Sequence, residues 1–150
     1  MEQIEVFEEI DASPELVWEV LTEFPSYPEW NPFITSAEGT VADGETLRLR
    51  IEPPGGRTRT VDVEIVVVEP GHRLAWQGRL LVPFALDGYH EVRLEPIGDG
   101  RTRLLQRETF RGALTSLLVD EAALERGFRG MNRALKTRTE GAAMRANSDA

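Results

Sequence analysis

The chain has 150 residues, 41% hydrophobic and 29% charged, which is an ordinary composition for a globular protein and the usual length of one domain. It contains no cysteine, which excludes disulfides and thiolate metal sites. The net charge is −9 and residues 1–47 contain no base, so we do not expect nucleic acid as a partner. The chain begins without a signal-peptide pattern, and no apolar run reaches the roughly 18 residues of a membrane span, so we expect a cytoplasmic protein.

The first part of the chain predicts a strand followed by two short helices. Apolar residues alternate with polar ones over residues 4–10, as a half-buried strand requires. Ser13 suits the N-cap of a helix and Pro14 suits its first position, while Pro25 ends that helix. Residues 25–33, PSYPEWNPF, combine prolines and aromatic residues more densely than any other part of the chain. Their prolines allow only a short helical turn.

A hairpin around the Gly-Asp-Gly turn at residues 98–100 has a register that the side chains define. Pairing across this turn brings opposite charges together on one face and mainly apolar groups together on the other, and a slip of one residue would destroy both matches. The inward pairs are Leu94 with Leu104, Val92 with Gln106, and His90 with Glu108.

A second hairpin turns at residues 69–72, Glu-Pro-Gly-His. The same reasoning places apolar side chains opposite one another on its inward face and makes Trp76 an inward residue. The inward pairs are Val67 with Leu74, Ile65 with Trp76, and Val61 with Leu80.

After Gly112 the spacing of apolar residues becomes helical and predicts a long helix over residues 120–140. This helix is the element long enough to cover the apolar face of the predicted antiparallel sheet. We expect residues 141–150 to form a disordered tail. The stripe that faces the sheet consists of Leu124, Phe128, Met131 and Leu135.

Several motifs resemble those of one known superfamily. They are IDASP at residues 10–14 followed by Val17-Trp18, YPEWNP at 27–32, EPGHRLAW at 69–76, and the closing helix. By these motifs the chain is similar, over roughly residues 3–140, to the START-like or SRPBCC superfamily, in the branch with polyketide cyclase-like proteins. The resemblance implies one α+β domain over residues 1–150 with a helix-grip fold, in which a curved antiparallel sheet of about seven strands wraps a long C-terminal helix and two short helices follow the first strand.

The resemblance further implies a deep, mostly apolar cavity between the sheet and the long helix. It places residues 25–33 at the mouth of this cavity, where the aromatic residues supply contact area at little entropic cost. Trp30 and Phe33 would then line the mouth, or they would simply plug the end of the sheet. Both roles are compatible with this position.

The candidate site residues lie on the inward face. His90 opposite Glu108 can form a charge-assisted hydrogen bond, and such a pair can satisfy itself in a core, anchor a ligand, or act as acid and base. The candidate catalytic residues are therefore His90 and Glu108. The expected ligand-binding residues are Trp30, Phe33, Leu49, Ile65, Trp76, His90, Gln106, Glu108, Phe110, Phe128 and Met131.

Two further features bear on the site. Gly127 and Gly130 interrupt the predicted helix at a cost of about 1 kcal/mol each, and they either make space for a ligand or are tolerated surface positions. His72 and His90 are far apart and no metal-ligand spacing occurs, so we expect no metal and no cofactor.

Three hypotheses for the function follow. The first is binding or transport of a small hydrophobic molecule such as a lipid, polyketide, isoprenoid or aromatic, by a monomer or weak dimer. The second is a polyketide cyclase/dehydratase-like enzyme that uses His90 and Glu108 as an acid–base pair. The third is an interaction module similar to chaperone activators. The superfamily includes proteins of all three kinds, so the fold does not choose among them.

Overall fold

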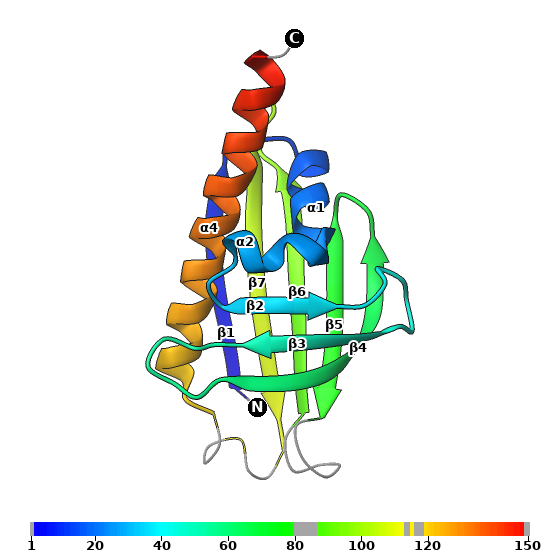
Figure 1. Cartoon of the computed structure of the whole chain (residues 1–150), viewed down its shortest axis with the longest axis vertical. Helices are drawn as coiled ribbons and strands as arrows, with labels where there is room; N and C mark the ends of the chain where they lie inside the picture. The colour runs from blue at the N-terminus through cyan, green and yellow to red at the C-terminus, as the bar shows by residue number, and fades with distance from the viewer. Residues whose placement is uncertain (1, 80–86, 113–114, 116–118, 149–150) are drawn as a thin grey trace.

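A computed structural model of the chain describes residues 2–79, 87–112, 115 and 119–148 (Figure 1). Its strands form a seven-stranded antiparallel sheet in the order β1-β7-β6-β5-β4-β3-β2. The strands are β1 (Glu2–Ile10), β2 (Ile34–Glu38), β3 (Thr46–Ile51), β4 (Arg59–Glu69), β5 (Arg73–Arg79), β6 (Asp87–Pro96) and β7 (Thr102–Arg111). The helices are α1 (Pro14–Thr22), a 3-10 turn (Phe24–Ser26), α2 (Tyr27–Trp30) and α4 (Glu121–Ser148).

The sheet curls, so that β2 and β3 run across the front of β6 and β7 (Figure 1). The long helix α4 lies along β1 and also contacts α1, α2 and β7. The concave face of the sheet therefore faces α4 and the short helices, and the apolar core lies between them. This arrangement is the α+β helix-grip fold, with two short helices after the first strand. The largest fully buried side chains in this core include Ile10, Leu21, Leu47, Leu49, Ile65, Leu74, Leu104 and Met131.

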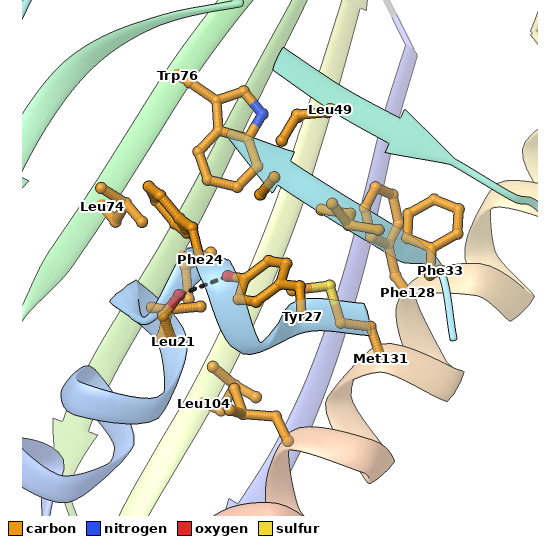
Figure 2. Packing of buried hydrophobic residues seen from close by; sticks show 14 of the residues in the cluster. Leu21, Phe24, Tyr27, Phe33, Leu49, Leu74, Trp76, Leu104, Phe128 and Met131 are labelled. Carbon is orange, nitrogen blue, oxygen red and sulfur yellow. Dashed lines mark hydrogen bonds between the residues drawn. The ribbon is translucent and has the colours of Figure 1, made fainter. Parts of the chain in front are cut away.

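The local sequence explains how α1 and the following turn are placed. The Ser13 hydroxyl accepts a hydrogen bond from the Leu16 N–H at 3.2 Å, and Pro14 occupies the first turn of α1. Tyr27 is fully buried, and its hydroxyl donates to the Leu21 carbonyl at the end of α1 (Figure 2). This hydrogen bond ties the turn after α1 to the core.

The expected register of the β6–β7 hairpin is confirmed, including the pairs Val92 with Gln106 and His90 with Glu108. In the β4–β5 hairpin Ile65 pairs with Trp76 as expected, but Leu74 pairs with Val68 and not with Val67. The register shifts by one residue between Ile65 and Val67, because β4 carries an irregularity there that the turn sequence does not reveal. Trp76 keeps its inward position opposite Ile65, and Leu80, the expected partner of Val61, lies outside the described residues.

The C-terminal helix is longer than the sequence predicts. It continues to Ser148, through residues for which we expected a disordered tail. The segment contains alanines and Met144, which are strong helix formers, and Ala143 packs against the core cluster. None of the helices in the described ranges has the length and apolar character needed to cross a membrane.

Candidate functional site: a cavity between the sheet and the long helix

A cavity of about 180 Å³ lies between α4 and the concave face of the sheet. Among the described residues, its walls come from β2 to β7, from the β3–β4 connection and from the first turns of α4, and most of the side chains are apolar. Seven of the expected ligand-binding residues line it, namely Phe33, Leu49, Trp76, His90, Glu108, Phe110 and Phe128. Further apolar walls come from Ile34, Ile51, Val61, Val63, Val119, Ala123 and Leu124.

Trp30, Ile65, Gln106 and Met131 were expected to contact a ligand but do not line this cavity. Ile65 and Met131 are fully buried in the core. Trp30 packs edge-on against Tyr27 with ring centroids 5.1 Å apart. The sequence predicts that these side chains face inward, but only packing decides which inward side chains fill the core and which border the space that is left.

The cavity reaches solvent away from residues 25–33, where we expected its mouth. The exposed residues of its lining are Gly56, Arg57 and Arg59 on the β3–β4 connection, and Asp120 before α4. Residues 25–33 do not surround this opening, and Phe33 is the member of that stretch that reaches the cavity.

Asn31 gives the physical reason why Phe33 points inward. The Asn31 Oδ1 atom accepts hydrogen bonds from the N–H groups of Phe33 and Ile34 at 3.0 and 2.9 Å, which turns the chain from α2 into β2. The Phe33 ring then lies against Phe128 of α4, with centroids 4.9 Å apart (Figure 2). Phe33 therefore both closes the inner end of the cavity and forms part of its wall.

Aromatic rings form a continuous wall around His90. The His90 ring stacks on Trp76, with ring centroids 4.6 Å apart and ring planes 17° apart. The Phe128 ring also lies beside His90, with ring centroids 5.1 Å apart. His90 is 3% exposed, so this imidazole is part of the packed wall and not a group in solvent.

A chain of hydrogen bonds passes through His90. Its Nδ1 atom lies 3.1 Å from Oε2 of Glu108, and its Nε2 atom lies 2.9 Å from Oε1 of Gln106. The amide nitrogen of Gln106 in turn donates to Oδ1 of Asn132 on α4. Both ring nitrogens of His90 are thus engaged by protein groups, and the imidazole orientation is fixed from two sides.

Asn132 is the member of this chain that the sequence reasoning missed. It is 1% exposed and lies beside Met131 on the buried face of α4. A polar residue on an otherwise apolar helical face was the signal that could have found it, because a buried amide requires a partner.

Glu108 carries the carboxylate on the inner wall of the cavity. Its side chain is 16% exposed, and only Oε2 is bonded to His90. The second oxygen, Oε1, has no hydrogen bond to another described residue and lies next to Gly88, where a Cβ atom would be 3.0 Å away. Gly88 pairs with Gly78 across β5 and β6, and both glycines line the cavity. The missing side chain of Gly88 therefore leaves open space beside the carboxylate, whereas a Cβ atom at Gly78 would meet Val63 at 2.9 Å.

The helical glycines have separate roles. A Cβ atom at Gly127 would overlap the Phe33 ring, so that glycine makes space for a core side chain and not for a ligand. Gly130 is half-buried, and its Cβ atom would approach Pro32 at 3.9 Å, which is ordinary contact.

The curled sheet, the long C-terminal helix and the cavity between them define a START-like helix-grip domain. Residues 1–140 match the family described as "Polyketide cyclase / dehydrase and lipid transport", and the chain belongs to that family. The description of this family names cyclase and dehydrase activities together with lipid transport. No curated protein sequence compared with the chain is significantly similar to it.

Solved structures with the same fold are distant in sequence. The Zhui aromatase/cyclase from Streptomyces sp. R1128 is 22% identical, with a TM-score of 0.75 and 93% of each chain covered. A START superfamily protein from Mycobacterium smegmatis is 19% identical, with a TM-score of 0.71, and the match covers 93% of this chain and 98% of that chain. Norcoclaurine synthase from Thalictrum flavum, in complex with dopamine and hydroxybenzaldehyde, is 14% identical, with a TM-score of 0.71 and coverage of 93% and 87%. These likenesses concern the fold alone.

Proposed function

We propose that the protein binds a small hydrophobic molecule, about the size of one aromatic ring, in the cavity between the sheet and α4. An apolar cavity of about 150 Å³ is large enough to bind benzene, whereas pockets for drug-sized ligands measure about 300–1,000 Å³. The cavity here, at about 180 Å³, lies near the lower of these sizes. A whole polyketide chain or a long acyl chain would exceed it.

One observation favours binding over catalysis. Both nitrogens of His90 are engaged by Glu108 and Gln106, so the imidazole has no free nitrogen with which to exchange a proton with a ligand. Oε1 of Glu108 is the acceptor that remains, and it faces the cavity. A single fixed acceptor suits a ligand hydroxyl, and His90 acts as a positioning residue that holds the carboxylate in place.

A matched pair of alanine variants tests the location of the site. Ala123 is 3% exposed and lines the cavity, while its neighbour Ala122 is exposed and does not. Ala123→Leu fills the cavity, so we expect phenol to bind at least tenfold more weakly, while thermal stability stays equal or rises. Ala122→Leu should bind phenol as the wild type does. Unchanged binding in the Ala123→Leu protein would show that the ligand sits elsewhere.

The role of Glu108 is tested by comparing phenol with anisole, which has no hydroxyl proton. A hydrogen bond to a charged group contributes about 1.5–3 kcal/mol, so phenol should bind roughly tenfold or more tightly than anisole. Glu108→Gln should reduce that preference while the fold is kept. Binding can be followed by nuclear magnetic resonance through the indole N–H of Trp76 on the cavity wall. Equal affinities for the two probes in the wild type would remove Glu108 from the site.

The second candidate is a dehydratase, because a carboxylate hydrogen-bonded to histidine at 3.1 Å is a plausible general base. A suitable probe is 4-hydroxy-4-phenyl-2-butanone, which loses water to give the conjugated enone. Glu108 would take the proton next to the carbonyl and return it to the departing hydroxyl. Ultraviolet absorbance follows the reaction, and Glu108→Gln should reduce turnover by about a hundredfold with binding largely intact. Absence of turnover in the wild type would leave the binding function.

The interaction-module hypothesis has little surface evidence in its favour. In the described part of the chain, the exposed large hydrophobic residues are Phe7 on β1 and Met144 on α4, and single exposed hydrophobics are ordinary. The cytoplasmic location and the monomeric or weakly dimeric state stay predictions, and gel filtration coupled to light scattering checks the latter.

A further inference from the structure

Two arginines face the cavity at its open end. Arg59 begins β4 and continues the inward row of Val61 and Val63, and Arg57 lies two residues before it on the β3–β4 connection. Both arginines line the cavity, and both are exposed. The inward positions that follow on β4, Val61 and Val63, are apolar. The arginines therefore lie where the cavity meets solvent.

These arginines differ from their neighbours on β3. Arg48 points outward and bonds Asp62 at 2.9 Å, and this hydrogen bond lowers the pKa of the Asp62 carboxyl. Arg50 lies 3.7 Å from Glu52. The side chains of Arg57 and Arg59, by contrast, have no ion pair or hydrogen bond with any group in the described part of the chain, although the sequence contains 26 acidic residues.

The charged groups of the described lining thus differ between its inner wall and its opening, where two arginines outnumber one acid. Glu108 offers a carboxylate oxygen on the inner wall, and two guanidinium groups stand at the opening. The other acid of the lining is Asp120, whose Oδ1 atom accepts a hydrogen bond from the Ala123 N–H at the start of α4. A ligand that satisfies both ends has a hydroxyl at one end and an anion at the other.

We propose that the ligand is a phenolic acid, and this inference rests on the proposed function. The ring lies in the cavity against Trp76 and Phe128, the phenol hydroxyl donates to Glu108, and the carboxylate lies at the opening between Arg57 and Arg59. Arginine suits this task because its planar guanidinium matches a carboxylate with two parallel hydrogen bonds. The same donors also accept a phosphate, so the test includes both anions.

Three probes with the same ring separate the possibilities. They are 3-(4-hydroxyphenyl)propionate, its neutral amide, and 2-(4-hydroxyphenyl)ethyl phosphate. We expect the carboxylate to bind the wild type about tenfold more tightly than the amide, a difference equivalent to about 1.4 kcal/mol. We expect the phosphate to bind no more tightly than the carboxylate. The preference for the carboxylate should weaken as salt is added, because the arginines are exposed.

The decisive variant is the double substitution Arg57→Gln with Arg59→Gln. It should bind the amide as the wild type does and lose the preference for the carboxylate. The control is Arg133→Gln with Arg145→Gln, which removes the same charge from exposed α4 residues that do not line the cavity. The control protein should keep the preference. Circular dichroism verifies that both proteins are folded.

The outcomes distinguish this inference from the proposed function on which it rests. If the amide binds the wild type as tightly as the carboxylate does, the phenolic-acid inference is wrong while the cavity site stands. The same holds if the carboxylate still binds more tightly than the amide in the Arg57/Arg59 double variant. If the phosphate binds more than tenfold tighter than the carboxylate, the anion is a phosphate ester and the phenolic acid is again wrong. If none of the three probes binds, both the inference and the single-ring site fail.

Discussion

Gly127→Ala tests the packing that closes the inner end of the cavity. In a helix interior, alanine is more favourable than glycine by about 1 kcal/mol, so the substitution would ordinarily stabilise α4. At this position, however, the new methyl group would overlap the Phe33 ring, which is 2% exposed and packs against Phe128. Overpacking of this kind costs about 1–3 kcal/mol. We therefore expect a net loss of stability of about 0–2 kcal/mol.

Gly130 provides the matched control, because it lies on the same helix one turn further along. A methyl group at Gly130 would meet Pro32 at 3.9 Å and nothing closer. The helix-propensity term is then unopposed, and Gly130→Ala should stabilise the protein by roughly 0.5–1 kcal/mol.

Thermal unfolding followed by circular dichroism measures both changes. For a protein of this size, 1 kcal/mol corresponds to roughly 2–4 °C in Tm. The Tm of Gly130→Ala should lie above that of the wild type, and the Tm of Gly127→Ala should lie at or below it. If Gly127→Ala raised the Tm as much as Gly130→Ala does, the Phe33 ring would not pack on Gly127, and the inner wall described here would be wrong.

Two further predictions concern buried hydrogen bonds. Gln106→Leu removes the partner of both His90 Nε2 and Asn132 Oδ1, so urea unfolding should show a loss of stability of about 1–3 kcal/mol. The control, Thr109→Val on the outer face of β7, should change stability by less than about 0.5 kcal/mol. Equal losses in the two variants would contradict the hydrogen-bond chain through Gln106. Burial raises the pKa of Tyr27 above its usual value of 10.0, so the folded state keeps a proton that the unfolded state releases, and stability falls as the pH rises above about 10. Tyr27→Phe should lose about 0.5–1.5 kcal/mol near neutral pH and show a shallower alkaline decline between about pH 8 and about pH 11, whereas an unchanged slope would place Tyr27 in contact with water.

Much of the site could be predicted from the β6–β7 hairpin alone. Its register is specified twice, by charge pairs outside and mainly apolar pairs inside, and that redundancy placed His90, Gln106 and Glu108 on one face. The β4–β5 register was wrong between Ile65 and the turn, where only apolar residues define its inner face. One apolar residue can replace another opposite the partner strand, so a β-bulge can shift the register by one residue. No residue between Ile65 and Val67 indicates such a bulge in the sequence.

The remaining features depend on how distant elements meet. The position of the opening follows from where the β3–β4 connection reaches the start of α4, and no periodicity in the sequence encodes that contact. The role of Gly127 follows from the Phe33 ring, which approaches from a strand far away in the chain. Arg59 lies on the inward row of β4 and Arg57 lies just before that strand, yet two arginines beside a Gly-Gly turn are equally typical of a solvated loop.

The most direct test of the account is a crystal structure of the protein soaked in phenol. The account predicts a ring between Trp76, Phe110 and Phe128, with its hydroxyl within hydrogen-bond distance of Oε1 of Glu108. Side chains filling this space, or phenol bound only on the outer surface of the sheet, would contradict the claim that the cavity between the sheet and α4 is the binding site.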